Sequence, residues 1–277
     1  MIDGNTTLIA HLGYPTKTFK APMIFNPYFR EIGINATVMT MGVTAEHYSQ
    51  VFPAVFKLTN IRGSLVTMPH KVTTVAFLDE VSTAVKVAGA CNAVLRRPDG
   101  TLYGDLFDGE GFVRGIQRKG WRVQGARALV VGCGGVGSAI AAALAGAGTA
   151  NIALYDVDTR RAEGLAARLE RHYAGTGITT GSNSAAGHDI VVNATPLGMN
   201  ADDPMPIDVG AIAPSTRVAD VVMREELTPF LRAVRQHGCE IQGGVDMVFE
   251  QVPLYLELFG FPTTTPDKLR TLARIEY

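Results

Sequence analysis

A glycine-rich segment at residues 132–137 (GCGGVG) is the part of the sequence whose residue types and spacing indicate a particular chemistry. An apolar run at 128–131 precedes it, which is typical of a buried strand, and an alanine-rich run at 136–146 follows, which is typical of a helix. In this setting the first glycine permits a tight turn, the third position lets backbone N–H groups approach a pyrophosphate, and the last allows close packing of helix on strand. The sequence therefore predicts a dinucleotide site lined by Gly132, Gly134, Gly135, Val136 and Gly137.

The residues after the next predicted strand indicate which dinucleotide binds. That strand, at 151–155, ends at Asp156, which lies 19 residues beyond Gly137. A carboxylate there can accept hydrogen bonds from both ribose hydroxyls and repels a 2′-phosphate, so we expect NAD. NADP remains the less favoured cofactor, because the basic residues Arg160 and Arg161 follow shortly after. The alternative without any ligand is that the glycines serve only to form a tightly packed turn.

Three polar residues in the first part of the chain stand at the ends of predicted strands. They are Lys71 in residues 66–71 (VTMPHK), Asn92 in residues 89–93 (GACNA) and Asp108 in residues 104–109 (GDLFDG). Each of them taken singly is typical of a solvated surface.

In this order, ahead of the glycine-rich turn, these segments resemble the shikimate dehydrogenase family. Six segments are similar to family motifs: residues 13–22 resemble GxPxxHSxSP, 66–71 resemble NVTxPxK, 88–92 resemble GAxN, 104–109 resemble GxNTDG, 193–199 (NATPLGM) resemble NATxxGM, and 244–251 resemble GxxMLxxQ. Six matches in order are far more specific than any one of them, and they run through nearly the whole chain.

The resemblance implies that Lys71 and Asp108 are the catalytic acid–base pair of a CH–OH dehydrogenase in shikimate or quinate metabolism, a part of aromatic amino acid biosynthesis. Oxidising an alcohol requires a proton to leave the hydroxyl as hydride leaves the carbon, and the reverse reaction needs a proton donor. Thr67, Asn92 and Gln251 would hydrogen-bond ring hydroxyls of the substrate. Without a ligand, Thr67 would be an ordinary strand residue, Asn92 a turn former and Gln251 a surface position on a helix. The resemblance also implies a nicotinamide site near Asn193, Thr195, Pro196, Val221, Gly244 and Met247.

The departures from the family pattern are concentrated in the expected substrate pocket. Phe19 and Ala21 stand where the family has the two serines that hold the substrate carboxylate, and Met223 stands where it has a tyrosine. The remaining exchanges replace polar family residues by Thr18, Leu65, Leu106 and Phe107. Each lost charge-assisted hydrogen bond costs roughly 1.5–3 kcal/mol, so we hypothesise that shikimate itself is a poor substrate. A less polar cyclic alcohol, or one with its acid group elsewhere, would fit better. Lys17 or Lys20 could replace the lost anion partner; the alternative is that both are ordinary solvated lysines.

Alternating strand-like and helical runs predict an α/β fold of two domains, with the active site in the cleft between them. We place an N-terminal substrate domain at 1–112, completed by C-terminal helices at 245–277, and a Rossmann-type dinucleotide-binding domain at 113–244. A mainly parallel sheet is expected in the first domain, with a hairpin around residues 96–100 (RRPDG).

Composition limits the remaining classes. The net charge is −1 with no long run of either sign, which disfavours a nucleic-acid binder. Three widely spaced cysteines form no metal-ligand cluster and favour a reducing, cytoplasmic setting, and we expect neither a metal nor a membrane segment. A small-molecule substrate and a monomer or homodimer are expected. A non-catalytic NAD-binding sensor, and an NAD enzyme of amino-acid or tetrahydrofolate metabolism, remain as alternatives.

Overall fold

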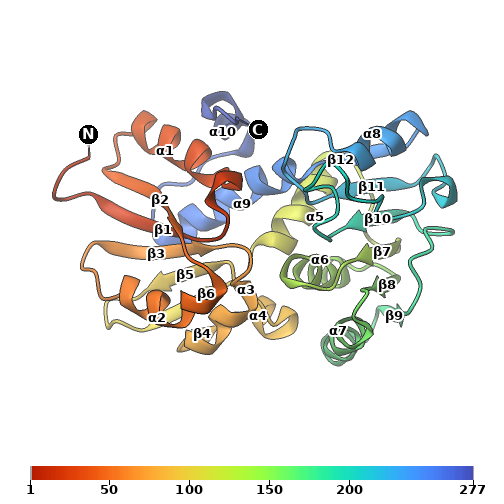
Figure 1. The fold of residues 1–277 in the computed structure, drawn as a ribbon, viewed down its shortest axis with the longest axis horizontal. Helices are drawn as coiled ribbons and strands as arrows, with labels where there is room; N and C mark the ends of the chain where they lie inside the picture. The colour runs from red at the N-terminus through yellow and green to blue at the C-terminus, as the bar shows by residue number, and fades with distance from the viewer. Residues whose placement is uncertain (1, 277) are drawn as a thin grey trace. The chain divides into compact units, whose positions relative to one another are not determined.

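The computed structural model describes residues 2–276, which divide into two compact units. Residues 2–107 and 251–276 form one, called here the N-terminal unit, and residues 108–250 form the other, the central unit. Figure 1 shows the elements of both. The two-domain α/β class predicted from the sequence is confirmed, and the last helices of the chain belong with its first residues. No helix of the described residues is both long and apolar enough to span a membrane.

The N-terminal unit is built on a six-stranded mixed sheet of order β2-β1-β3-β5-β6-β4. Its strands are β1 (Thr7–Gly13), β2 (Ala36–Gly42), β3 (Ile61–Val66), β4 (Glu80–Val81), β5 (Ala93–Arg96) and β6 (Leu102–Asp105). Strand β1 runs parallel to β2 and β3, whereas β5 is antiparallel to both β3 and β6. The β5–β6 hairpin is the one that the turn residues predict, but it makes the sheet mixed rather than mainly parallel.

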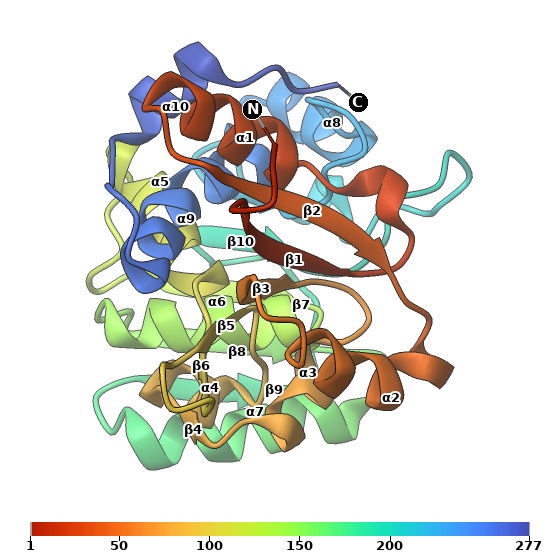
Figure 2. The same ribbon diagram turned by 90° about the vertical axis from the view of Figure 1, so that its left-hand side faces the viewer.

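The helices of the N-terminal unit are α1 (Ala21–Glu31), α2 (Ala45–Val55), α3 (Lys71–Thr74), α4 (Thr83–Ala88) and α10 (Pro266–Leu272). Two of them, α1 and α2, bury aromatic side chains. Phe25 and Phe29 of α1 are almost fully buried, and Phe25 packs edge-on against Tyr255 with ring centroids 6.1 Å apart. Tyr48 of α2 stacks on His70 at 3.8 Å. Figure 2 shows α1 and α10 side by side. These layers place the ends of β1 and β3 among aromatic rings.

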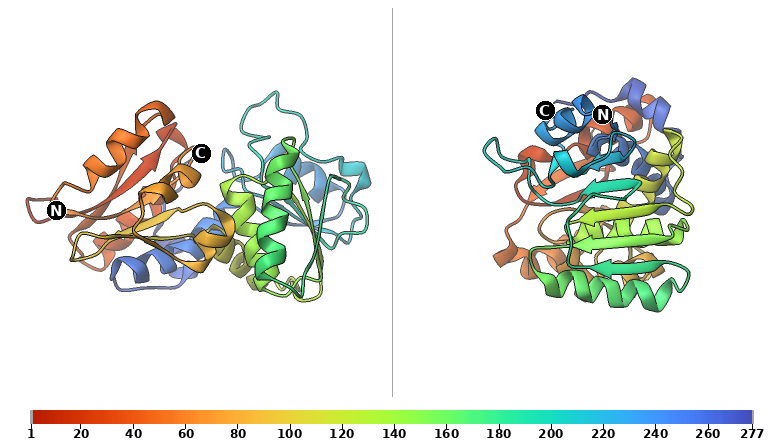
Figure 3. Two further views of the ribbon diagram at one scale, coloured as in Figure 1. Left: turned by 90° about the horizontal axis from the view of Figure 1, so that it is seen from below. Right: turned by 90° about the vertical axis from the view of Figure 1, so that its right-hand side faces the viewer.

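The central unit has a six-stranded sheet in which every pairing is parallel. Its order is β12-β11-β10-β7-β8-β9, and its strands are β7 (Arg127–Val131), β8 (Asn151–Tyr155), β9 (Gly177–Thr180), β10 (Ile190–Asn193), β11 (Arg217–Asp220) and β12 (Glu240–Gln242). Figure 3 shows these strands aligned. Helices α5 (Asp108–Arg118), α6 (Gly135–Gly146), α7 (Thr159–His172) and α8 (Pro229–Gln236) accompany it. Central strands of parallel sheets are buried on both faces, which explains the unbroken apolar runs in β7 and β10.

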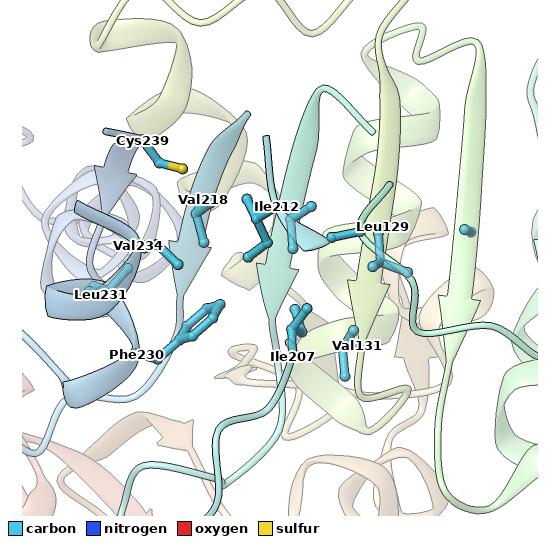
Figure 4. Close-up of a cluster of buried hydrophobic side chains, with 12 residues drawn as sticks. Leu129, Val131, Ile207, Ile212, Val218, Phe230, Leu231, Val234 and Cys239 are labelled. Atoms are coloured by element: carbon cyan, nitrogen blue, oxygen red, sulfur yellow. The ribbon is translucent and has the colours of Figure 1, made fainter. Parts of the chain in front are cut away.

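One face of this sheet is covered by a cluster of buried apolar side chains (Figure 4). Leu129 and Val218 come from the strands, and Phe230 and Val234 come from α8. All four are at most 2% exposed. The cluster fixes the strand register, and so it fixes where β7, β10 and β11 end.

Helix α5 is not predicted from the sequence, because Gly109, Gly111 and Gly115 lower its helix propensity. One of these glycines is there for packing. A Cβ at Gly109 would lie 2.1 Å from the carbonyl oxygen of Ala139 in α6. Helices α5 and α6 therefore meet backbone to backbone.

The chain passes between the units at Phe107–Asp108 and at Glu250–Gln251, within the long helix α9 (Gly244–Phe259). These bounds lie a few residues from the predicted ones at 112 and 244. The difference arises because a helix belongs to a unit through its packing, which a composition break in the sequence does not reveal.

Candidate functional site

The glycine-rich turn of the central unit has the geometry that its sequence predicts. Gly132 directly follows β7 with a φ of +100°, and a Cβ there would lie 2.7 Å from the carbonyl oxygen of Ala194. A Cβ on Gly137 would lie only 1.8 Å from the carbonyl oxygen of Gly132. Gly132 excludes any other residue because side chains rarely adopt its positive φ and no space remains for them, and Gly137 does so for lack of space alone.

The second glycine of the turn faces open space. Gly134 is the N-cap of α6, and nothing lies within 4 Å of a Cβ built on it. It has no side chain that could cap the first N–H groups of the helix, those of Gly135, Val136 and Gly137. Unpaired N–H groups and the helix dipole make such an end a site for an anion. The turn thus fits the pyrophosphate of a dinucleotide.

We expect Gly134→Ala to weaken dinucleotide binding without lowering the stability of the fold. Its backbone angles (φ −71°, ψ −168°) suit alanine, so the melting temperature should stay at the wild-type value. The methyl group would displace the pyrophosphate from the N–H groups, and losing one or two such hydrogen bonds weakens binding by about tenfold or more. Titration of NADH by fluorescence measures this. Gly146→Ala, at the other end of α6 and in ordinary contact with Tyr173 at 3.6 Å, is the matched control. Unchanged affinity in Gly134→Ala would contradict the assignment.

Asp156 is fixed at the tip of β8 beside this turn. The backbone N–H of Cys133 donates to its Oδ2 at 2.7 Å, and the N–H of Asp158 donates to its Oδ1 at 2.9 Å. A carboxylate has about four acceptor positions, so it can still accept ribose hydroxyls. Arg160 and Arg161, the pair that kept NADP open, have their side chains directed to Asp158 at 3.2 and 3.7 Å.

A buried polar network organises the adjoining edge of the sheet. Asn193 donates from Nδ2 to Oδ1 of Asp220 at 3.0 Å, and its Oδ1 accepts from the N–H and the hydroxyl of Thr195. Asp220 also accepts from the N–H of Val222 at 3.0 Å and from the hydroxyl of Thr228 at 2.6 Å. Two of the predicted nicotinamide neighbours, Asn193 and Thr195, are thereby held in one loop. Pro196, the next predicted neighbour, is exposed.

This network makes the stability of the fold depend on pH. Burial raises the pKa of Asp220 to about 6 from its ordinary value near 3.8. The group therefore stabilises the fold below pH 4, and that contribution is lost as the pH rises through 6, a change of roughly 3 kcal/mol. Asp220→Asn keeps an acceptor for Asn193 and Val222 and removes the ionisation. Its melting temperature should rise relative to the wild type between pH 4 and pH 7. Parallel curves would contradict this.

The remaining predicted cofactor residues of the central unit lie together after β11. A Cβ on Gly244 would lie 2.6 Å from the carbonyl oxygen of Val221 and 2.8 Å from Cγ of Met223. Gly244 begins α9, one turn before the buried Met247. Sequence positions more than twenty residues apart are thus brought into contact.

Three predicted residues of the N-terminal unit converge through backbone pairing. Thr67 follows β3, and its N–H donates to the carbonyl of Leu12 at the end of β1. The carbonyl of Lys71, the first residue of α3, accepts from the N–H of Cys91, and the carbonyl of Asn92 accepts from Val66. Thr67, Lys71 and Asn92 therefore lie at neighbouring strand ends.

Asn92 is held in a defined orientation. It is 1% exposed, and its Oδ1 accepts from the N–H of Phe107 at 3.0 Å. Tyr255 donates its hydroxyl to the Asn92 carbonyl at 3.3 Å, and its ring packs edge-on against Phe107 at 5.0 Å. The amide nitrogen of Asn92 has no hydrogen-bond partner among residues 2–276, which leaves it able to donate to a ligand.

Of the other predicted residues, Asp108 is buried as the first residue of α5 in the central unit. Gln251 is 5% exposed on α9, so the alternative of a surface helix position is wrong. Phe19 and Ala21 are both buried beside α1.

Lys20, considered as an anion partner, donates instead to the carbonyl of Glu276 near the end of the chain. His70 is held inside the fold by Tyr48 and by a 2.7 Å contact of its Nε2 with the Val43 carbonyl, so it is a packing residue. The sequence reasoning missed His11, which is buried in β1 with its ring stacked on Phe19.

Comparison with known proteins connects these observations. Residues 12–94 match the family model of the shikimate dehydrogenase substrate binding domain, and residues 115–166 match that of the ThiF family. The NADP(+) shikimate dehydrogenase of Rubrobacter xylanophilus is 34% identical over 258 residues, covering 90% of this chain and 89% of that protein.

Two solved structures resemble the fold over nearly its whole length. The quinate dehydrogenase of Corynebacterium glutamicum, in complex with NAD, is 27% identical with a TM-score of 0.85, covering 96% of this chain and 98% of that one. The 5-ketofructose reductase of a Gluconobacter strain is 26% identical with a TM-score of 0.84, covering 98% of both chains. Together with the relative at 34% identity, they lead to one conclusion: the chain belongs to the shikimate dehydrogenase family of nicotinamide-dependent oxidoreductases.

Proposed function

We propose that this protein is an NAD-dependent dehydrogenase that transfers hydride reversibly between a ring hydroxyl of a shikimate- or quinate-like cyclic alcohol and the nicotinamide. The observation that carries the proposal is the glycine-rich turn, whose open third position and uncapped helix end fit a dinucleotide, beside the fixed carboxylate of Asp156.

The preference for NAD rests on charge. Asp156 and Asp158 follow β8 in succession, and the residue between them, Val157, is 91% exposed and apolar. A 2′-phosphate here would meet carboxylates, while Arg160 and Arg161 are directed to Asp158. The curated relative from Rubrobacter xylanophilus is named for NADP(+), whereas the solved quinate dehydrogenase binds NAD. We propose that this chain resembles the second in its cofactor.

The proposed chemistry assigns a role to each polar residue. Lys71 and Asp108 exchange the proton of the reacting hydroxyl, which must leave or arrive as hydride moves. Thr67 and the unpaired amide of Asn92 hold other ring hydroxyls, and Gln251 contributes from α9. The bound nicotinamide supplies the hydride acceptor or donor. Orientation of the ring by these residues is what makes the transfer selective.

A second substrate class has support from the N-terminal unit. The positions that the resemblance assigns to carboxylate-binding serines are the buried Phe19 and Ala21, which cannot donate hydrogen bonds. The solved 5-ketofructose reductase shows the same fold in a protein named for an uncharged sugar. A cyclic hydroxy compound without a carboxylate is therefore the alternative substrate.

A substrate panel tests both. Purified protein is assayed with NAD and with NADP against shikimate, quinate, methyl shikimate and D-fructose, with 5-ketofructose and NADH in the reverse direction. Turnover of shikimate or quinate with NAD supports the first substrate class, and turnover of only uncharged compounds supports the second. NADH binding without turnover of any member would instead favour a non-catalytic sensor.

A further inference from the structure

His11 lies in the middle of β1, where it pairs in register with Thr40 of β2 and Leu65 of β3. Its side chain is 6% exposed, and Nδ1 has no hydrogen-bond partner among the described residues. Buried polar groups are nearly always hydrogen-bonded, so a buried nitrogen without a partner requires an explanation. One explanation is a ligand that supplies the missing hydrogen bond.

The surroundings of His11 belong to the proposed substrate region. Its ring stacks on Phe19 with centroids 4.1 Å apart and planes inclined by 28°. Phe19 also lies beside Gly13, where a Cβ would be 2.9 Å from the Phe19 ring and 2.4 Å from the methyl group of Thr67. Lys71 is close enough for its ammonium charge to act on the imidazole. His11 is thus linked to Thr67 and Lys71 through direct neighbours.

His11 is neutral at physiological pH. Burial lowers the pKa of the imidazole to about 3, and the positive charge of Lys71 acts in the same direction. A neutral imidazole has one nitrogen that donates and one that accepts. A hydroxyl oxygen can donate and accept as well, so it can bond Nδ1 in either tautomer. A carboxylate only accepts, and it would be desolvated beside the Phe19 ring at a high cost.

We propose that His11 is a specificity-determining residue that hydrogen-bonds an uncharged oxygen of the substrate, a hydroxyl or carbonyl, at the end of the ring where Phe19 and Ala21 replace the carboxylate donors. This rests on the proposed function and narrows its substrate class to neutral cyclic alcohols and ketones. The unpartnered nitrogen provides the hydrogen bond, and the apolar stack disfavours a charged oxygen there because of its desolvation.

Nitrogen NMR of the full chain labelled with ¹⁵N-histidine tests binding without turnover. His11 resonances are assigned from their loss in His11→Asn. The probes are methyl shikimate, which is neutral, and shikimate, which has the same ring hydroxyls and a carboxylate. Methyl shikimate should shift a ring nitrogen of His11, and shikimate at equal concentration should not. No shift with the ester, or an equal or larger shift with shikimate, would overturn the proposal.

Two substitutions then separate hydrogen bonding from packing. His11→Phe keeps an aromatic ring against Phe19 but has no polar atom. His11→Asn places an amide atom near the position of Nδ1. With a neutral substrate, His11→Phe should lower kcat/KM about ten- to a hundredfold, mostly through KM, whereas His11→Asn should restore most of it. Melting temperatures of both variants show that the fold is intact.

The two proposals fail in different ways. Turnover that disappears in Lys71→Ala but is unchanged in His11→Phe would reject the role of His11 and leave the dehydrogenase function in place. A His11 shift with methyl shikimate in a protein without Lys71-dependent turnover would reject the function and support the binding role.

Discussion

Lys71→Ala is expected to lower kcat by about a hundred- to ten-thousandfold, the usual contribution of a positioned acid–base residue. The reason is that alanine has no group that can exchange the proton of the reacting hydroxyl, and Lys20 is directed to the Glu276 carbonyl. The fold should survive, because the backbone carbonyl of Lys71, which accepts from the N–H of Cys91 at 2.8 Å, is present in alanine.

The measurement is steady-state turnover, followed by the absorbance of the reduced nicotinamide, with the best substrate of the panel. Lys86→Ala, which removes an exposed lysine from α4 in the same unit, is the control and should keep full activity. NADH affinity should be unchanged in both variants. A Lys71→Ala enzyme with wild-type kcat would remove Lys71 from the catalytic pair.

Asp156→Ala is expected to abolish the preference for NAD over NADP. The wild type should favour NAD, because the Asp156 carboxylate accepts ribose hydroxyls and repels a 2′-phosphate. Removing two hydrogen bonds to a charged acceptor should lower kcat/KM for NAD by about a hundredfold or more. Repulsion of NADP disappears in the same variant, so its kcat/KM should fall much less or rise.

The comparison is the ratio of kcat/KM values for the two cofactors at one ionic strength, since salt screens the repulsion. Because Asp156 also accepts the Cys133 and Asp158 N–H groups, the melting temperature is measured alongside. Glu163→Ala removes an exposed acid from the following helix and should leave the ratio unchanged. A wild-type enzyme that prefers NADP would contradict the proposed cofactor directly.

The cofactor turn could be predicted because its information is local. The strand, glycines and helix are contiguous, and two of the glycines are required by close neighbours: Gly132 by Ala194 and Gly137 by the Gly132 carbonyl. Helix α7, at Thr159–His172, is determined locally as well: its apolar spacing is regular, and Asp158 caps it.

Long-range features could not be predicted. His11 sits in an apolar strand pattern, where a single histidine is typical of a core position, and its open nitrogen emerges only when Phe19 is folded against it. Asp220 stands at the end of a strand in the sequence, but its hydrogen bonds come from Asn193 and Thr228, which lie outside that strand. The helix α5 is stabilised by its contact with α6 rather than by propensity.

The backbone contact between Gly109 and Ala139 bears on how cofactor and substrate specificity could evolve. It ties Asp108, at the start of α5, to the same body as the dinucleotide turn, whereas Lys71, His11 and Asn92 belong to the other part of the chain. One member of the proposed catalytic pair, Asp108, therefore belongs to the unit that contains the dinucleotide turn. Recombination among relatives that exchanges residues 108–250 as a block would carry nucleotide choice and one proton-transfer group together. The choice of substrate would remain with the recipient, so the two specificities can evolve as separate modules.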